Sequence, residues 1–315
     1  MEPHSESHPD GGSIGLRLAL QAMGTRFELV LAGDRDEHEL RALGESALAC
    51  VREWHERLSI FGRGSLVSMI NAQAHEHAVR LDLDMLDLLR ECRRLTEITG
   101  GAFDVAVGSL MEYHGFRESE RPEKRPAFGM NCVEIDEQAM TIRFTEPGVK
   151  LDFGAIAKGW AIDRALDVLR EAGVRSALLH GGTSTIGALG SAPNCEPWRV
   201  KIEDSAEAPV ALLSDASLSV SAPKGRLNEQ NQGHVIDPRT GNPSLGARMA
   251  GAIAVYSAET DAISTALVVL NERTGSIPAD VVSILPGVSG GWEVRGDAED
   301  RIEFPDQAEE GQRSS

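Results

Sequence analysis

Two apolar spacings alternate along this chain, and the order in which they occur restricts its fold class. Residues 26–32 (RFELVLA) place Phe27, Leu29 and Leu31 at every second position, which predicts a half-buried strand. Residues 38–58 repeat apolar side chains at steps of three and four, which predicts an amphipathic helix. Strands and helices continue in mixed order, so the sequence indicates an α+β body of mixed sheets packed with helices, which can comprise two intimately packed subdomains.

Further segments carry one or the other pattern. The helical ones are residues 84–98, which end at Gly100 and Gly101, residues 154–173, which end at Gly173, and residues 259–271. The strand-like ones are a hairpin over residues 132–144 and single runs at 149–153, 176–180, 251–256 and 281–285. No linker interrupts them, so we expect one folded body over residues 16–295. The polar ends, residues 1–15 and 296–315, are expected to be disordered.

Net charge and hydropathy exclude several classes of protein. The chain has 49 acidic and 31 basic residues and a formal charge of −18, which would repel nucleic-acid phosphates and anionic lipid surfaces. Because no stretch approaches about 18 uninterrupted apolar residues and the N-terminal residues show no secretory pattern, we expect no membrane segment and a cytoplasmic protein. The four cysteines lie too far apart for a zinc ribbon or a dense disulfide scaffold.

A glycine pair follows one of the predicted strands, in the segment HGGTSTIGALG at residues 180–190. Glycines at such a place let backbone N–H groups approach a phosphate closely. No helical pattern follows, and neither GxGxxG nor GxxxxGK[ST] is present, which excludes a Rossmann fingerprint and a Walker loop. A glycine-rich turn between two strands remains the simpler interpretation of the segment taken alone.

The segment TDAISTAL places Asp261 and Thr265 four residues apart, so both side chains share one face of the predicted helix. Carboxylate and hydroxyl oxygens are hard ligands that suit Mg²⁺, which is often held by one carboxylate together with substrate phosphates. The alternative is that Asp261 only complements the positive end of its helix.

The segment GHVIDPRTGNP at residues 233–243 presents His234 beside the turn at Asp237 and Pro238. An imidazole titrates near neutral pH and is a natural general base. A histidine beside a turn can equally be structural or simply solvated.

Seven segments stand in a recognisable order along the chain: MGTRFELVL, LSIFGRGSLVSMIN, GGAFDVAVGSLMEYHGF, LDFGAIAKGWAID, GGTSTIGALG, GHVIDPRTGNP and TDAISTAL. Together they resemble the signature blocks of the FAD:protein FMN transferases, the ApbE-type flavin transferases, over about residues 20–287. The resemblance implies the ApbE-like fold. It also implies a transferase that binds FAD and Mg²⁺, cleaves the FAD pyrophosphate, attaches FMN to a threonine of an acceptor flavoprotein and releases AMP.

The resemblance also implies roles for individual residues. Asp261 and Thr265 would hold Mg²⁺ together with the backbone carbonyl of Ala155, and His234 would take the proton of the acceptor threonine. Residues that match positions near FAD are Met23, Asn71, Asp104, Lys158, Gly181, Gly182 and Thr183. For two of these a simpler role stays open, since Lys158 can lie on a helix surface and Asp104 can be structural.

This chain departs from the family pattern at several positions. Thr183 stands where the family commonly has an aspartate after the glycine pair, Phe61 stands where it often has a tyrosine, and residues 221–232 match its pattern only loosely. Two alternatives to the transferase therefore stay open. One is an FAD pyrophosphatase that releases free FMN and AMP, and the other is a non-catalytic FAD-binding carrier.

Overall fold

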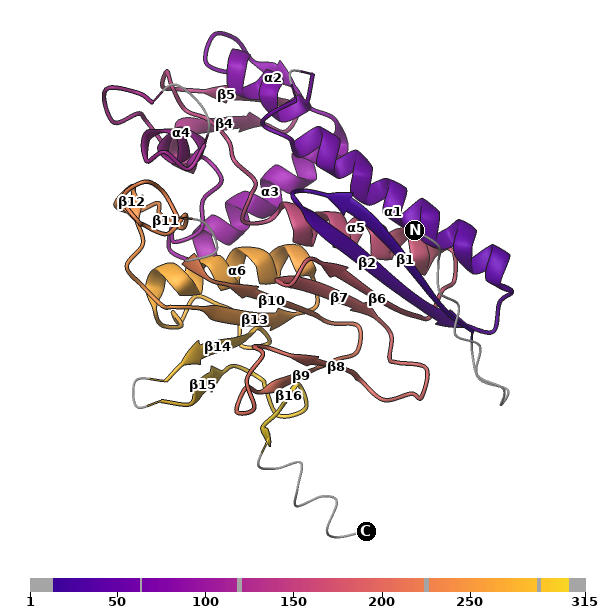
Figure 1. Cartoon of the computed structure of the whole chain (residues 1–315). Helices are drawn as coiled ribbons and strands as arrows, with labels where there is room; N and C mark the ends of the chain where they lie inside the picture. Colours follow the sequence, from indigo (N-terminus) through magenta and orange to yellow (C-terminus); the bar gives the residue numbers. More distant parts are fainter. Residues whose placement is uncertain (1–13, 63, 118–120, 224–226, 288–289, 306–315) are drawn as a thin grey trace.

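The computed structural model describes residues 14–62, 64–117, 121–223, 227–287 and 290–305. Its centre is an eight-stranded antiparallel sheet (Figure 1) with the strand order β1-β2-β6-β7-β10-β13-β14-β15. These strands are β1 (Ile14–Ala22), β2 (Thr25–Gly33), β6 (Ser176–Gly181), β7 (Thr185–Leu189), β10 (Ser217–Ser221), β13 (Ala250–Ala254), β14 (Val282–Pro286) and β15 (Trp292–Arg295).

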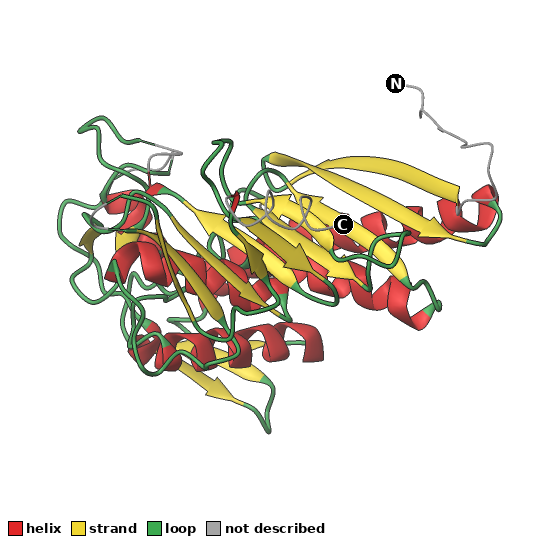
Figure 2. Ribbon diagram, turned by 90° about the horizontal axis from the view of Figure 1, so that it is seen from below, coloured by secondary structure: helices red, strands yellow, loops and turns green. Residues whose placement is uncertain are grey.

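Helices cover one face of this sheet, and Figure 2 shows them gathered along that side. They are α1 (Glu37–Leu58), α5 (Ala157–Glu171) and α6 (Ser257–Leu270), whose apolar stripes pack on Phe27, Leu29 and Leu31 of the sheet and on one another. The other face carries a second apolar core under a three-stranded sheet of β8 (Trp198–Lys201), β9 (Val210–Leu213) and β16 (Ile302–Glu303). None of the helices in the described part of the chain is both long and apolar enough to span a membrane.

The chain between α1 and α5 forms a smaller region above the main sheet (Figure 1). Its elements are α2 (Leu66–Gln73), β3 (Val79–Arg80), α3 (Leu83–Ile98), α4 (Gly108–Tyr113), the 3₁₀ helix η1 (Met130–Cys132), β4 (Val133–Asp136) and β5 (Thr141–Phe144). The short pair β11 (Ile236–Asp237) and β12 (Asn242–Pro243) lies against α4, because Ile236 is buried with Leu110, Met111 and Phe116. Apolar residues of α2 and α3 belong to the same core as those of α5 and α6, so the two regions pack intimately.

The α+β fold class is confirmed, and so are most of the expected elements. The four predicted helices correspond to α1, α3, α5 and α6, the hairpin to β4 and β5, and strand-like runs to β2, β6, β13 and β14. The fold opens with the hairpin β1–β2 rather than with a single strand. Helix α2 was not expected from the sequence, because it is short and its N-cap signal, Ser65, stands alone.

The strand expected at residues 149–153 is absent, because other groups occupy its backbone. The carboxamide of Asn71 donates to the carbonyl of Leu151 at 2.9 Å and accepts from its N–H at 2.7 Å. The carbonyl of Lys150 accepts from Gly108 at 2.9 Å. With these groups engaged locally, no neighbouring strand can form a ladder here.

The prediction for the C-terminal end is partly wrong. Residues 296–305 are ordered, and Ile302 and Glu303 pair with β9 as β16 because Ile302 is an apolar anchor that is only 8% exposed. The rest of the predicted disordered ends, residues 1–13 and 306–315, lies outside the described residues.

Helices α5 and α6 approach one another closely at Gly159. A Cβ at this position would lie 2.1 Å from the carbonyl oxygen of Ser257, so only glycine fits. Neither helix has a side-chain cap of its own, and each receives one from the other. Asp163 of α5 accepts from the N–H groups of Ser257 and Ala258 at 2.7 and 2.8 Å. In return, Asp261 of α6 accepts from the N–H of Gly159 at 2.8 Å.

We expect Gly159→Ala to destabilise the protein by about 1–3 kcal/mol or more, because the added methyl group meets backbone that cannot rotate away. Thermal unfolding should show a loss of several degrees. Gly33→Ala is the matched control, since nothing lies within 4 Å of a Cβ at Gly33. Equal melting temperatures for the two variants would contradict the close packing of α5 and α6.

Candidate active site

The centre of the candidate site is the carboxylate of Asp261, which is only 3% exposed. One oxygen, Oδ1, accepts from the hydroxyl of Thr185 at 2.5 Å and from that of Ser219 at 2.7 Å. The other, Oδ2, accepts from the Gly159 N–H and lies 3.7 Å from the ammonium of Lys158. Four elements, α5, α6, β7 and β10, therefore meet at one buried anion whose hydrogen bonds and cation compensate its desolvation.

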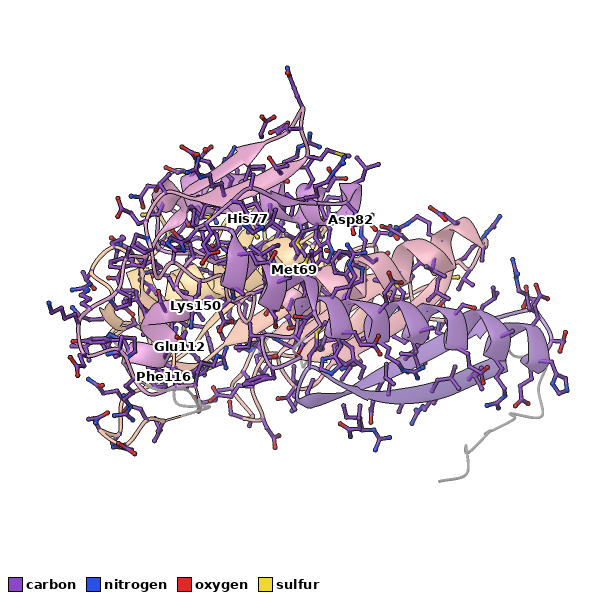
Figure 3. The ribbon with its side chains drawn as sticks, turned by 90° about the horizontal axis from the view of Figure 1, so that it is seen from above. Met69, His77, Asp82, Glu112, Phe116 and Lys150 are labelled. Atoms are coloured by element: carbon purple, nitrogen blue, oxygen red, sulfur yellow. The ribbon has the colours of Figure 1, made fainter. Side chains whose placement is uncertain are left out.

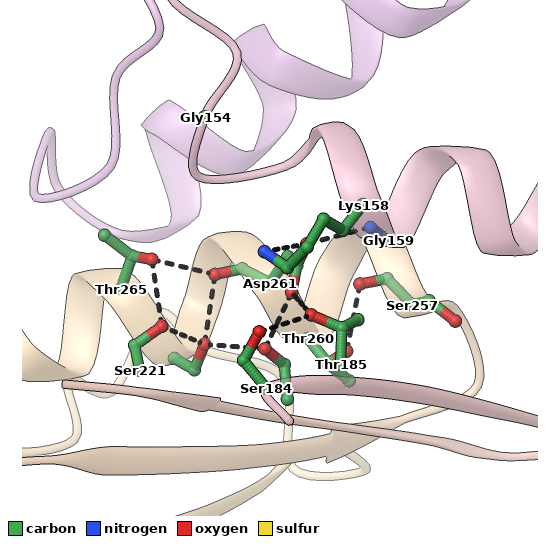
Figure 4. A network of polar contacts seen from close by, with 12 residues as sticks. Gly154, Lys158, Gly159, Ser184, Thr185, Ser221, Ser257, Thr260, Asp261 and Thr265 are labelled. Carbon is green, nitrogen blue, oxygen red and sulfur yellow. Dashed lines mark hydrogen bonds and ion pairs between the residues drawn. The ribbon is translucent and has the colours of Figure 1, made fainter. Parts of the chain in front are cut away.

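A row of polar contacts, which we call the polar seam, joins β10 to α6 (Figure 4). Its pairs are Ser217 with Ser257 at 2.8 Å, Ser219 with Asp261 at 2.7 Å and Ser221 with Thr265 at 3.2 Å. Figure 4 labels both residues of the last pair. Alternate residues of a strand and every fourth residue of a helix repeat at nearly equal distances, so the two rows can face one another. The seam holds Asp261 and Thr265 on the sheet side of α6. Their spacing in the sequence predicts that they share one face of the helix, and the contacts with β10 show which face it is.

Two turns lie side by side at the end of the sheet next to Asp261. In the β1–β2 turn, Met23 adopts a positive φ of 50°, and its N–H donates to Nδ1 of His55 at 3.2 Å. In the β6–β7 turn, Gly182 has a φ of +71°, and its N–H donates to the Arg26 carbonyl at 3.0 Å. A Cβ on Gly182 would lie 2.3 Å from the Thr25 hydroxyl, so glycine is required there. The structure thus brings together the Met23 turn and the Gly181–Gly182 turn.

Thr183 follows this turn and is exposed, while Thr185, two residues further on, is buried against Asp261. The hydroxyl of Thr183 can offer one donor and its lone pairs to a ligand but no negative charge. The position at which the family commonly has an aspartate therefore contributes no anion to this site.

Ala155 lies in the segment before α5, and Lys158 is the second residue of that helix. Figure 4 shows Gly154 on the loop that passes over α6 on the side of Thr265 and Asp261. The loop is held by Asn71, through both backbone groups of Leu151, and by an ion pair of Asp152 with Arg117. Asn71 therefore acts in this structure by fixing the loop.

Asp104 lies in the smaller region and is engaged by backbone groups. Its carboxylate accepts from the N–H groups of Ala106 at 2.7 Å and Met130 at 2.8 Å. Burial raises the pKa of Asp104, and these two hydrogen bonds partly oppose that shift. The geometry favours the structural role over contact with FAD.

His234 is oriented by the chain that leaves β10. Its ring nitrogen Nδ1 lies 3.1 Å from the carbonyl oxygen of Pro223. The backbone N–H of His234 donates to the same oxygen at 3.2 Å. Because a carbonyl can only accept, Nδ1 is the ring nitrogen that carries a proton, which makes Nε2 the nitrogen that can take one up. Pro223 stands two residues after Ser221, which contacts Thr265, so the structure connects His234 to the polar seam. Residues 224–226 of the loosely matching segment lie outside the described residues.

Two cavities open on the surface. One of about 310 Å³ lies between α2, α4 and the loop, and its walls include Asn71 and the ion pair of Lys150 with Glu112, which face one another in Figure 3. A larger cavity of about 770 Å³ lies at the opposite end of β6 and β7, beside Arg175 and Tyr256. None of the residues selected from the sequence lines the larger cavity, so its size does not mark the site.

Within the described residues, no three His, Cys, Asp or Glu side chains come together as a metal cluster. The oxygens near Asp261 are nevertheless hard donors of the kind that Mg²⁺ takes. The hydroxyl of Thr265 donates its proton to the Asp261 carbonyl at 3.0 Å and therefore accepts from Ser221 at 3.2 Å, which leaves one oxygen lone pair for a cation. One carboxylate and few protein ligands fit a cation that is shared with phosphates.

Sequence reasoning missed several residues of the site. It gave no role to Thr185, Ser219 or Asp163, although each is buried and bonded to α6. One signal was present, since serines at 217, 219 and 221 alternate and therefore line one face of a strand.

A family model described as the ApbE family matches residues 23–279. A curated relative from Rhodobacter capsulatus, named FAD:protein FMN transferase, is 33% identical over 240 residues, which cover 70% of this chain and 44% of that protein. A second of the same name, from Haemophilus influenzae, is 26% identical over 285 residues, 82% of this chain and 81% of that protein.

Solved structures share the fold. The ApbE protein from Thermotoga maritima superposes with a TM-score of 0.79 at 23% identity, covering 90% of this chain and 97% of that chain. The flavin transferase ApbE from Vibrio cholerae gives 0.75 at 23% identity, covering 91% and 98%. At these identities the likeness establishes the fold.

Asp104 yields a prediction for stability against pH. Its folded-state pKa lies above the ordinary value of 3.8, so the folded protein binds this proton more tightly than the unfolded chain does. The contribution of Asp104 to the free energy of unfolding is therefore greatest below pH 3.8, the ordinary pKa. It is lost as the pH rises through the folded-state pKa.

Asp104→Asn should remove this decline. Denaturant unfolding of both proteins from pH 4 upward should show the wild-type free energy falling relative to that of the variant. Asp87→Asn, at an exposed carboxylate, is the control. A wild-type free energy that rises relative to the variant would contradict the assigned cause.

Proposed function

The chain belongs to the ApbE family, and we propose that it is an FAD:protein FMN transferase that attaches FMN to a threonine of an acceptor flavoprotein and releases AMP. The observation that carries the proposal is that the match over residues 23–279 includes every candidate residue. The match covers only 44% of the length of the Rhodobacter relative. The activity of that whole protein is therefore a proposal for this chain.

The reaction exchanges one phosphorus–oxygen bond for another. The threonine oxygen of the acceptor forms a bond to the phosphorus of the FMN half of FAD, the bond from that phosphorus to the bridging oxygen breaks, and AMP leaves with this oxygen. Such a transfer depends on positioning and on stabilising charge at the phosphates. The ammonium of Lys158, 3.7 Å from Asp261, supplies positive charge for this purpose.

The acceptor hydroxyl must lose its proton as it attacks. We assign this proton to Nε2 of His234, since the Pro223 carbonyl holds the proton of the ring on Nδ1. Asp237 supports this arrangement, because its carbonyl accepts from Gly241 at 2.7 Å and its carboxylate pairs with Arg239 at 2.9 Å. The turn that follows His234 is thereby fixed.

We further propose that Mg²⁺ is held by Asp261, Thr265 and the carbonyl of Ala155. These oxygens suit the ion as hard donors, as set out above. When bound, the ion would neutralise charge on the pyrophosphate.

The proposal is tested by incubating the protein with FAD, Mg²⁺ and a threonine-bearing acceptor domain, and measuring AMP and the acceptor mass together. We expect one FMN on the acceptor for each AMP released. AMP without labelling would support the pyrophosphatase, for which the loosely matching segment around Ser221 is the motive. FAD that stays bound without AMP release would support the carrier.

His234→Gln should lower the transfer rate by about 10²–10⁴-fold, because it removes the general base. Affinity for FAD should change little, since the base acts on the acceptor. The control is His77→Gln, at an exposed histidine in the loop after α2 (Figure 3). An unchanged rate in His234→Gln would refute the assignment.

Asp261→Asn should reduce turnover to background, because the amide lacks the charge and opposes the Gly159 N–H with a donor of its own. Turnover is measured as AMP release across a range of Mg²⁺ concentrations. Glu259→Gln, on the same helix but paired with Arg94, should retain activity. Wild-type turnover in Asp261→Asn would refute the metal assignment.

A further inference from the structure

We propose that Asp163 is a positioning residue for the transfer reaction: it fixes the first turn of α6 and thereby places Asp261 and Thr265 against the loop before α5. This inference rests on the proposed function, because it concerns the same site. Asp163 itself would touch neither FAD nor the acceptor.

The geometry of Asp163 is that of a clamp between two helices. It lies in α5 and is 8% exposed, yet both of its carboxylate oxygens accept from backbone of α6, Oδ1 from Ser257 and Oδ2 from Ala258. The N-cap residue of α6, Tyr256, makes no side-chain cap. Asp163 therefore satisfies two of the N–H groups that a helix start leaves without an intrahelical partner.

This clamp lies one helical turn from the candidate site. Ser257 and Asp261 are four residues apart, so a shift of the first turn moves the Asp261 carboxylate along the helix axis. Asp261 in turn bonds Gly159, one turn before Asp163 on α5. The two carboxylates thus close a ring of contacts that allows only one register between α5 and α6.

Asp163 is costly to keep at this position. Burial raises its pKa to about 7, since the backbone hydrogen bonds and Arg164 only partly offset the desolvation of the charge. A neutral side chain would avoid this cost.

The test compares Asp163→Asn with wild type at pH 8. Asparagine offers one acceptor oxygen where α6 presents two donors, so the first turn loses a bond while the buried charge disappears. We expect the melting temperature to stay within about 5 °C of wild type. We expect the Mg²⁺ concentration for half-maximal AMP release to rise about 10-fold, the size of effect typical of groups that support metal ligands.

A readout without turnover accompanies this measurement. Mn²⁺ prefers the same oxygen ligands as Mg²⁺ and can be titrated through its electron paramagnetic resonance signal. Its dissociation constant should also rise about 10-fold in Asp163→Asn. Asp167→Asn, one turn later on α5 and paired only with Arg164 and Arg170, is the matched control and should change neither value.

A second pair of variants keeps the carboxylate and alters its donor. Ser257→Pro removes one N–H that Asp163 accepts, at a helix position where proline is tolerated, while Ser257→Ala keeps that N–H. Both variants lose the hydroxyl that contacts Ser217, so the further weakening of Mn²⁺ binding in the proline variant relative to the alanine variant measures the lost N–H. This pair decides the question if Asp163→Asn does not fold.

The outcomes separate this inference from the proposed function. Wild-type protein that binds Mn²⁺ but releases no AMP refutes the function and leaves the comparison of Mn²⁺ affinities as the test of Asp163. Equal Mn²⁺ affinities in wild type and Asp163→Asn refute the inference even if AMP is released. A wild type that binds no Mn²⁺ refutes it as well.

Discussion

The close approach of α5 and α6 at Gly159 is the constraint on which the rest of the structure depends. Because the helices touch through backbone, each can reach the N-terminal turn of the other with an aspartate, and neither needs a cap of its own. Helix α5 fixes the loop that precedes it, and α6 carries the reactive face. The site is therefore built between helices from separate parts of the chain, and the sheet beneath holds both.

Hydroxyls, rather than further charges, surround the buried carboxylate of Asp261. A hydroxyl can donate to an anion without adding charge, so Thr185 and Ser219 stabilise Asp261 and leave Lys158 as its cation. A second buried carboxylate at this point would repel the first. At the surface, Thr183 likewise presents a hydroxyl, at the position where the family pattern commonly has an aspartate. The chemistry at this end of the sheet thus rests on one negative group.

Much of the fold followed from periodicity, because α1, α3, α5, α6 and the longer strands bury one regular face. The site was harder to predict. Spacing and side-chain chemistry make Asp261, Thr265 and His234 candidates, and the family resemblance implies their roles. Thr185, Ser219 and Asp163, by contrast, matter only once distant segments meet. Asn71 explains why the strand predicted at residues 149–153 is absent. Its carboxamide bonds both backbone groups of Leu151, which would otherwise pair with a neighbouring strand. Nothing in the sequence near residues 149–153 indicates this long-range contact. Local patterns predict elements, while tertiary hydrogen bonds decide which polar residues lie together.

The polar seam joins two elements whose repeats are only nearly equal. Alternate strand residues advance about 6.6 Å and every fourth helix residue about 6.0 Å, so the two rows drift apart by about 0.6 Å at each rung. At the last rung, Ser221 contacts Ser264 at 2.8 Å as well as Thr265 at 3.2 Å. A longer β10 or α6 would carry the two rows further out of step. Any further polar group at this site has to come from a third element, as Thr185 of β7 already does, so the size of the site is limited by the geometry of a helix lying on a strand.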